Sequence, residues 1–443
     1  TDDSVIRNGG EQIFLRRSRG FVPRTIKLKK PVPSISLAAG GDLKSAPALA
    51  IEDEVYLAPY LGDIETAKTE EAFTEQVEKM LSLYNVRPQR LIYDLHPGYF
   101  SSRWAMAQDV PQKIPIQHHF AHILSVMAEH GLDEVLGLSF DGTGYGTDGS
   151  IWGGEFLNVR RDGFRRLGCF RPFPLPGGDA AIVHPKRIST ALLNLDGFIA
   201  TEAAGRNMNA RISEELGLSE SELRLVVQML EKDINCPRTS SLGRLFDAAS
   251  ALLGFVDTMN YEGEGPIKME AAASEYLLEL DGTTKTEALM SPAGGFPRGP
   301  NISAASLALA GLPMLEGPGF RLLDNPKKDR RADLEVPEFY LDWGPVFTHI
   351  GKDLLNSRGP KENQAAMGLY FHRAVAEASL DAALRMREKT GISAISLSGG
   401  VFQNSLLLRL LKPLLDEAGF EVYCNDQLPP GDGGIALGQV YLL

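Results

Sequence analysis

The chain has 443 residues, of which 43% are hydrophobic and 23% are charged, and its formal net charge is −12. These proportions are those of a globular protein, and the length favours two or three domains. The acidic balance argues against nucleic acid as the main partner. No run of roughly 18 or more apolar residues is present, so we expect no membrane span. The first residues, TDDSVIRNGG, also lack the pattern of a secretory signal.

The cysteines and the basic N-terminal segment bear on location and partners. Cys169, Cys236 and Cys424 lie far apart and form no CxxC motif, which favours the reducing cytoplasm over a disulfide framework. Residues 1–30 contain eight Lys or Arg and three Asp or Glu, so their net charge of +5 leaves −17 for the rest. This segment is either a solvated basic tail or a part of another domain that handles a small anion.

Alternating and apolar runs predict a sheet followed by a helix after Pro33. We expect three short strands at residues 35–39, 46–51 and 55–59. Apolar residues recur at helical spacing from Phe73 to Tyr84, and RLIYD (90–94) then reads as another strand.

A second series of the same kind begins near residue 133. We expect strands at residues 135–141, 151–159, 164–170, 394–398 and 420–425, and a helix at residues 406–414 before the last of these strands. Two copies of this order indicate an α/β protein with the duplicated ribonuclease-H-like fold of actin, sugar kinases and heat-shock ATPases. In that fold a nucleotide binds in the cleft between two subdomains.

The expected domain boundaries follow from this duplication. We place the first subdomain at residues 31–132 and the second at residues 133–430. An insertion rich in Gly and Pro is expected around residues 257–362. Residues 431–443 are expected to form a terminal helix that returns to the first subdomain.

The segment QHHFAHILSVMAEHG (117–131) predicts an amphipathic helix that ends at a glycine. His118 and His122 are one turn apart on its polar face, so both imidazoles could bind one ion. Two histidines with carboxylates suit Zn²⁺ or Fe²⁺. The alternative is a simple exposed pair of histidines.

Carboxylates and glycine-rich turns supply further candidates. Asp141 closes a strand and precedes the glycines of GTGYG, whose backbone N–H groups could approach a phosphate. Asp432, between glycines before the last helix, could complete the metal site. An ordinary tight hairpin and a helix-capping acid are the respective alternatives.

Three more segments could contact a nucleotide. Lys44 follows a GGD turn in the first repeat, where it is either a phosphate-binding point charge or a surface lysine. The segment SLSGGVFQN ends a strand and starts a helix, an arrangement that can cradle a nucleotide, with Asn404 near the base. Asp247 and Glu262 are candidates for contacts with ribose hydroxyls. A P-loop motif and a kinase HRD/DFG set are both absent from the sequence.

Taken together, these segments resemble the HypF family of hydrogenase-maturation carbamoyltransferases over nearly the whole chain. The resemblance is carried, in the family's order, by RRSRGFVP, GGDLK, DLHPGYFSSRWA, QHHFAH, FDGTGYGTDGSIWGGEF, RPFPLPGGDAA, SSLGRLFDAASALLG and PPGDGGIALGQ. It implies that residues from about 31 onward are similar to threonylcarbamoyl-tRNA transferases. Residues 1–30, with Arg16, Arg17 and Arg19, look like the end of a YrdC-type domain. The family's modules upstream of that point are not seen, so we expect a fragment.

The resemblance also implies roles for single residues. His118, His122, Asp141 and Asp432 match metal ligands, and Lys44 and Asp141 match catalytic positions. The positions that match the nucleotide cleft are Gly142, Gly144, Gly146, Gly243, Asp247, Glu262, Gly399, Gly400 and Asn404.

The implied reaction starts from ATP, bound with Mg²⁺, and carbamoyl phosphate, and proceeds through carbamoyl-adenylate. The implied acceptor is the C-terminal cysteine of a HypE-type protein, whose thiocarboxamide becomes a cyanide ligand of the hydrogenase iron. A small-molecule O-carbamoyltransferase would share the same site residues and remains the alternative. Two other functions are also possible alternatives. A threonylcarbamoyl-tRNA transferase would need a basic face for tRNA, and an actin-like ATP-binding scaffold would need no metal.

Overall fold

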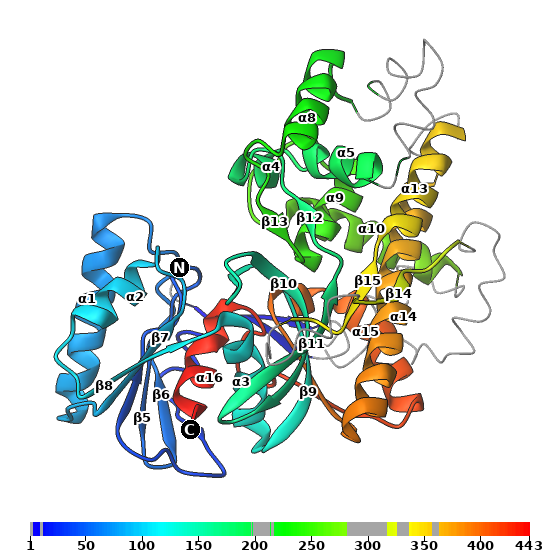
Figure 1. Ribbon diagram of the computed structural model, residues 1–443. Coiled ribbons are helices and arrows are strands. Elements are labelled where there is room, and N and C mark those ends of the chain that lie inside the picture. The colour runs from blue at the N-terminus through cyan, green and yellow to red at the C-terminus, as the bar shows by residue number, and fades with distance from the viewer. Residues whose placement is uncertain are drawn as a thin grey trace.

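The computed structural model describes residues 3–8, 12–195, 197, 213, 217–280, 317–325, 336–356 and 363–443. Two β-sheets stand side by side in it, with helices between them and on their outer faces (Figure 1). Within the described ranges no helix has the length and apolar character needed to cross a membrane.

The first sheet contains the strands expected between residues 35 and 94. Its strands are Ile26–Lys27 (β3), Ser36–Ala38 (β4), Ala48–Ile51 (β5), Glu54–Leu57 (β6), Arg90–Asp94 (β7) and Gln112–Ile116 (β8). Their order in the sheet is β3-β6-β5-β4-β7-β8. The pairs β4–β5 and β5–β6 are antiparallel, whereas β4–β7 and β7–β8 are parallel.

The second sheet is longer and has the order β14-β15-β11-β10-β9-β16-β17. These strands are Glu134–Tyr145 (β9), Ile151–Arg160 (β10), Gly163–Phe170 (β11), Arg321–Asp324 (β14), Phe339–Asp342 (β15), Ala394–Ser398 (β16) and Glu421–Cys424 (β17). The short strands Phe173–Pro174 (β12) and Arg238–Thr239 (β13) pair with each other beside β10.

The same topology occurs in both sheets. The order β6-β5-β4-β7-β8 in the first corresponds to β11-β10-β9-β16-β17 in the second. In each series the first three strands are antiparallel, and the last two run parallel to the first. The prediction of a duplicated ribonuclease-H-like fold is therefore confirmed.

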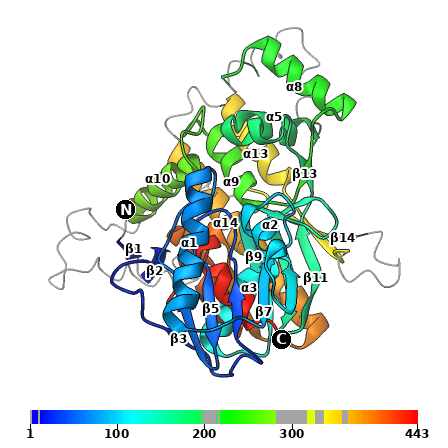
Figure 2. The ribbon, with the colours of Figure 1, turned by 90° about the vertical axis from the view of Figure 1, so that its left-hand side faces the viewer.

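Six helices arrange the two sheets into five layers (Figure 1). Figure 2 views the molecule from the side of the first sheet, with α1 in front. They are Ala67–Tyr84 (α1), Phe100–Ala107 (α2), His118–His130 (α3), Gln364–Thr390 (α14), Ser405–Glu417 (α15) and Ile435–Tyr441 (α16). Helices α1 and α2 cover the outer face of the first sheet, and α14 and α15 cover the outer face of the second. Helices α3 and α16 lie between the sheets and share one apolar core with both.

Helices α3 and α16 occupy equivalent places in the two copies, each following the last strand of its series. They cross very closely: a methyl group added at Gly438 of α16 would lie 1.9 Å from the carbonyl oxygen of Ala121 in α3. Only glycine permits this approach, because any Cβ would overlap the neighbouring backbone. The crossing fixes the relative position of the two halves of the protein.

The elements without a counterpart in the first sheet start directly after β11. They are β12, Asp179–Val183 (α4), Lys186–Leu195 (α5), Glu220–Lys232 (α8), β13, Leu242–Leu252 (α9), Glu264–Leu280 (α10), β14, β15 and Gly344–Asn356 (α13). The added region thus begins well before residue 257, where the insertion was predicted. Helix α9 packs on β9 and belongs to the main core. Its apolar pattern therefore looks like that of the helices of the duplicated fold, and the sequence did not show that α9 belongs to the added region. Residues 281–316, 326–335 and 357–362 of the predicted insertion lie outside the described residues.

The N-terminal residues divide between the two halves. Strands Val5–Asn8 (β1) and Gln12–Arg16 (β2) form an antiparallel hairpin. Ile13 is buried in the core of the second subdomain. Strand β3, in contrast, pairs with β6, so the first sheet begins before residue 31, the expected boundary.

We expect Gly438→Ala to lower the free energy of unfolding by about 3 kcal/mol or more, because the new methyl group must push α16 away from α3. Gly163→Ala is the matched control, since no heavy atom lies within 4 Å of a Cβ added there. Chemical denaturation of both variants measures the difference. Equal stability of the two variants would show that the helix crossing tolerates a side chain.

Candidate functional site

Helix α3 carries two histidines into the interior between the sheets. Its first turn is capped by Gln117, whose side-chain Oε1 accepts a hydrogen bond from the Phe120 N–H. His118 and His122 follow on successive turns of one face, and both rings are fully buried. The alternative of an exposed histidine pair is therefore excluded.

Two carboxylates meet these imidazoles. Asp141 comes from β9, and Asp432 begins a short 3₁₀ turn directly before α16. His118 Nε2 lies 3.2 Å from His122 Nε2, 3.4 Å from Asp141 Oδ2 and 3.6 Å from Asp432 Oδ1. His122 Nε2 lies 3.6 and 3.7 Å from the same two oxygens. We call these four residues the quartet.

The spacing of the quartet fits a single ion. Its four ligand atoms lie within 4.8 Å of one another. Atoms that each bond one metal at about 2.0–2.2 Å are separated by roughly 3–3.5 Å, close to the distances found here. Two imidazole nitrogens and two carboxylate oxygens suit Zn²⁺ or Fe²⁺. The donor set thus fits the metal that the sequence suggested.

The charges within the quartet stabilise one another. Burial alone would lower the pKa of His118, but the carboxylates of Asp94 and Asp432 and a hydrogen bond with Asp141 hold it well above its usual value. Burial would also raise the pKa of Asp141, yet the two imidazoles hold it well below its usual value. A metal ion bound between these residues would therefore replace the proton of His118.

Asp94 is a residue of the site that we did not identify from the sequence. It ends β7, and its Oδ2 lies 2.7 Å from His118 Nδ1. This contact directs Nε2, the other ring nitrogen, toward the quartet. Its other oxygen accepts the His96 N–H at 2.8 Å. An acidic residue at the end of a buried strand was the available signal, in the segment RLIYD.

The other two histidines of α3 have partners outside the quartet. His119 Nδ1 lies 3.1 Å from the side-chain amide of Gln117, and burial holds the pKa of His119 well below its usual value. His130 Nε2 lies 2.8 Å from the carbonyl oxygen of Cys424.

A cleft of about 410 Å³ opens beside the quartet and contains most of the other predicted site residues. Asp141 belongs to both, because it also lines this cleft. Its Oδ1 accepts the Gly400 N–H at 3.0 Å, while its Oδ2 faces the histidines. The further predicted residues along the cleft are Lys44, Gly142, Gly243, Asp247, Glu262, Gly400 and Asn404.

Lys44 is the cation that the first subdomain contributes to the cleft. Its ammonium lies 2.5 Å from Glu262 Oε2. Burial would lower the pKa of Lys44, but Asp432 and Glu262 raise it above its usual value. Lys44 therefore stays charged, next to both the cleft and the quartet.

Three predicted nucleotide-binding glycines are not among the residues that line the cleft. A Cβ at Gly144 would lie 2.5 Å from the His119 ring, and one at Gly146 would lie 2.3 Å from the Trp152 indole. Gly399, at φ 108°, would bring a Cβ to 2.2 Å from the carbonyl oxygen of Phe140. The close approach of neighbouring groups is by itself enough to require glycine at these positions.

Asp247 and Asn404 line the cleft but are already bonded to protein groups. Asp247 lies 3.1 Å from the Arg244 guanidinium, and burial raises the pKa of Asp247 to about 6. The Asn404 side chain accepts the Leu407 N–H as a helix cap and lies 2.8 Å from His372 Nε2. These bonds use one N–H and one carbonyl lone pair of the Asn404 amide, which has two of each, so a contact with a base would not require either bond to break.

The arginines of RRSRG do not line the cleft. Arg16 donates to the Asp3 carbonyl, and Arg19 forms an ion pair with the Asp3 side chain. Arg17 is buried and donates to the carbonyls of Phe21 and Arg24. Arg7, a different arginine of residues 1–30, does line the cleft, and no sequence pattern singled it out.

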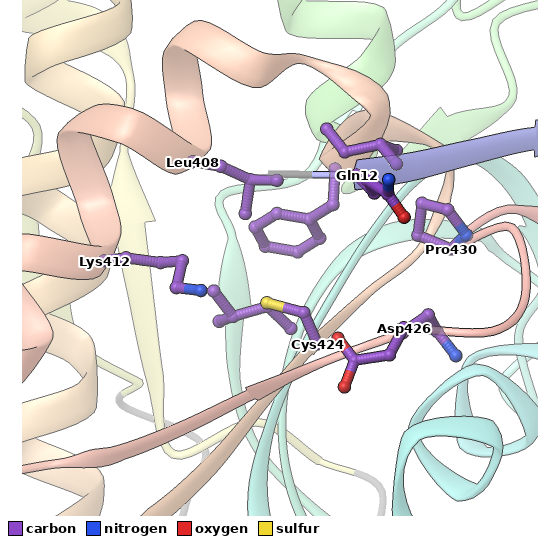
Figure 3. Close-up of a pocket in the computed structure, with 10 residues that line it drawn as sticks. Gln12, Leu408, Lys412, Cys424, Asp426 and Pro430 are labelled. Atoms are coloured by element: carbon purple, nitrogen blue, oxygen red, sulfur yellow. The ribbon is translucent and has the colours of Figure 1, made fainter. Parts of the chain in front are cut away.

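A second pocket, of about 400 Å³, lies between β2, α15 and the end of β17 (Figure 3). The 400–403 turn separates it from the cleft, because Phe402 lines this pocket and Val401 lines the cleft. None of the predicted catalytic, nucleotide-binding or metal-binding residues lines it. Its labelled residues are Gln12, Leu408, Lys412, Cys424, Asp426 and Pro430.

Comparisons with known proteins agree with this arrangement. A family described as "HypF Kae1-like domain" matches residues 32–129. One described as "Carbamoyltransferase, Kae1-like Domain, second subdomain" matches residues 137–292 and 321–439. The gap between the two matches falls at the start of β9, where the second copy of the fold begins.

Individual relatives match along nearly the whole chain. Carbamoyltransferase HypF2 of Cupriavidus necator is 36% identical over 100% of this chain and 51% of its own length. A carbamoyltransferase HypF homolog of the same organism is 33% identical over 92% of this chain and 90% of its own. A crystal structure of full-length HypF in its phosphate- and nucleotide-bound form has a TM-score of 0.81 at 31% identity, covering 100% of this chain and 50% of that one. The chain thus spans about half the length of HypF2 and of the crystallised HypF.

We expect Asp94→Asn to weaken Zn²⁺ or Fe²⁺ binding about 10–100-fold, because the carboxylate that orients His118 is lost. His130→Gln is the control, since this histidine of α3 lies outside the quartet. Competition with a chelator, followed by elemental analysis, measures the affinity. Wild-type affinity in Asp94→Asn would mean that Asp94 does not support the metal.

The raised pKa of Asp247 predicts that the stability of the folded protein depends on pH. Its pKa is raised in the folded protein, so it contributes stability at low pH, and this contribution is lost as the pH rises through about 6. Between about pH 5 and about pH 7.5 the wild type should lose about 1 kcal/mol relative to Asp247→Asn, which cannot ionise. Urea denaturation at both pH values measures this, and parallel pH profiles would contradict it.

Proposed function

The chain belongs to the HypF carbamoyltransferase family, and on this premise we propose that it transfers a carbamoyl group from carbamoyl-adenylate to a cysteine thiol. The proposed acceptor is the C-terminal cysteine of a HypE-type protein, and the product serves the cyanide ligand of [NiFe]-hydrogenase. In the whole protein, ATP with Mg²⁺ and carbamoyl phosphate would supply the adenylate. Because the chain spans about half of HypF2, we propose only the transfer step for the residues described.

One observation carries this proposal: the quartet and the cleft share Asp141. A nucleotide ester in the cleft would therefore place its acyl group within reach of an ion held by the quartet. An ATP-binding scaffold without chemistry would not need two imidazoles and two carboxylates buried at the edge of its nucleotide cleft.

The charged residues of the cleft suit an acyl transfer. The acceptor thiolate attacks the carbamoyl carbon, a C–S bond forms, the C–O bond to the phosphate breaks, and AMP leaves with the electron pair. Lys44 would offset the negative charge that grows on the departing phosphate. A metal in the quartet would supply a Lewis acid for the carbamoyl oxygen.

The orientation of the site is set by contacts within the chain. Asp94 fixes the ring of His118, and the Gly400 N–H fixes the carboxylate of Asp141. Because both bonds are made between groups of the chain itself, little reorganisation would be required when the reacting groups arrive.

The test is transfer of radiolabel from carbamoyl phosphate to HypE, with ATP and the intact full-length protein. We expect label on the C-terminal cysteine of HypE. The rate should fall about 100-fold in Lys44→Ala, because one charge that stabilises the leaving phosphate is removed. Lys68→Ala, at an exposed site on α1, is the charge-matched control.

Two outcomes would overturn this proposal. Labelling of an alcohol without HypE would favour the small-molecule O-carbamoyltransferase. Failure to label HypE while the full-length protein still consumes ATP and carbamoyl phosphate would remove HypE as the acceptor.

A further inference from the structure

The N-terminal hairpin forms one wall of the cleft. Arg7 on β1 and Leu15 on β2 both line it. The hairpin lies outside the residues that match the Kae1-like families, because those matches begin at residue 32. A segment that precedes the Kae1-like domain therefore contributes side chains to its cleft.

The guanidinium of Arg7 connects this hairpin to two elements of the second subdomain. It lies 2.8 Å from Glu270 Oε1 and 3.0 Å from Glu270 Oε2, on α10. It also donates to the carbonyl oxygen of Gln403 at 3.1 Å, in the turn between the cleft and the second pocket. The Arg7 side chain nevertheless remains 37% exposed.

Glu270 does not depend on Arg7 alone. Its Oε1 also accepts the Ser405 N–H and the Ser405 hydroxyl at 2.8 Å each, and the Leu406 N–H at 3.3 Å. These donors belong to the first turn of α15, where a carboxylate is favourably placed. If Arg7 turned toward another anion, Glu270 Oε1 would keep these three donors, whereas Oε2 would lose the bond from Arg7.

The cations of the cleft differ in their freedom to bind a ligand. Arg244 is paired with Asp247, and the two side chains are only 7% and 3% exposed. Lys44 is 26% exposed and belongs to the first subdomain. Arg7 is the most exposed of the three cations that line the described cleft. Its fork of N–H donors also fits two oxygens of one phosphate.

We propose that Arg7 binds the phosphate of a nucleotide in this cleft, so that an occupied cleft adds a phosphate contact to those that already hold the N-terminal hairpin against the second subdomain. This inference rests on the proposed function, since it takes the cleft as the nucleotide site. In the whole protein the hairpin would then couple the segment upstream of residue 32 to the occupancy of the cleft.

Calorimetric titration of the 443-residue chain with AMP and with adenosine tests this directly. Arg7→Gln should weaken AMP binding about tenfold or more, because a charge-assisted contact is lost, and should leave adenosine binding unchanged. Arg7→Lys should recover part of the AMP affinity, because it keeps the charge but not the fork. Arg24→Gln removes one positive charge from the same segment at an exposed position away from the cleft, and should behave as wild type.

Hydrogen exchange tests the coupling of the hairpin. AMP should slow amide exchange in residues 12–16 of the wild type and of Arg24→Gln, but not of Arg7→Gln. Wild-type AMP affinity in Arg7→Gln, or equal weakening of AMP and adenosine, would overturn the inference and leave Arg7 as a structural fastener. A wild-type chain that binds neither ligand would overturn the nucleotide cleft itself, and this inference with it.

Discussion

The carboxylate of Asp141 is the contact on which the rest of the site depends. One of its oxygens accepts the Gly400 N–H at the edge of the cleft, and the other faces the imidazoles of His118 and His122. Three elements, β9, α3 and the turn after β16, therefore meet at one side chain. A shift of the turn that borders the cleft would therefore also move a carboxylate of the quartet.

The duplicated fold explains how residues from both halves reach this point. His118 starts α3 and Asp432 directly precedes α16, the two equivalent helices that cross at Gly438. The segment before Asp432 is also held by α3. Glu129 accepts the backbone N–H groups of residues 426 and 427 and the Asn425 amide. The last turn of α3 thus supports the loop whose acid completes the quartet begun by its first turn.

The sequence predicted the features that depend on local patterns. Strand periodicity revealed the two copies of the fold, and the one-turn spacing of His118 and His122 indicated an ion site within a single helix. Asp94 and Arg7 were missed because their roles depend on partners brought together only by folding, at His118 and Glu270. The close packing around the glycines at 144, 146 and 399 could not be predicted, because the sequence does not distinguish close packing from an approach to a ligand.

The charges around the quartet determine what it can hold. Asp141 and Asp432 bring two carboxylates to the two imidazoles of α3, a donor set that suits a divalent ion. The same carboxylates, together with Asp94, raise the pKa of His118 when no ion is bound. A metal in the quartet would therefore compete with a proton for His118 Nε2, and acidification would weaken its binding.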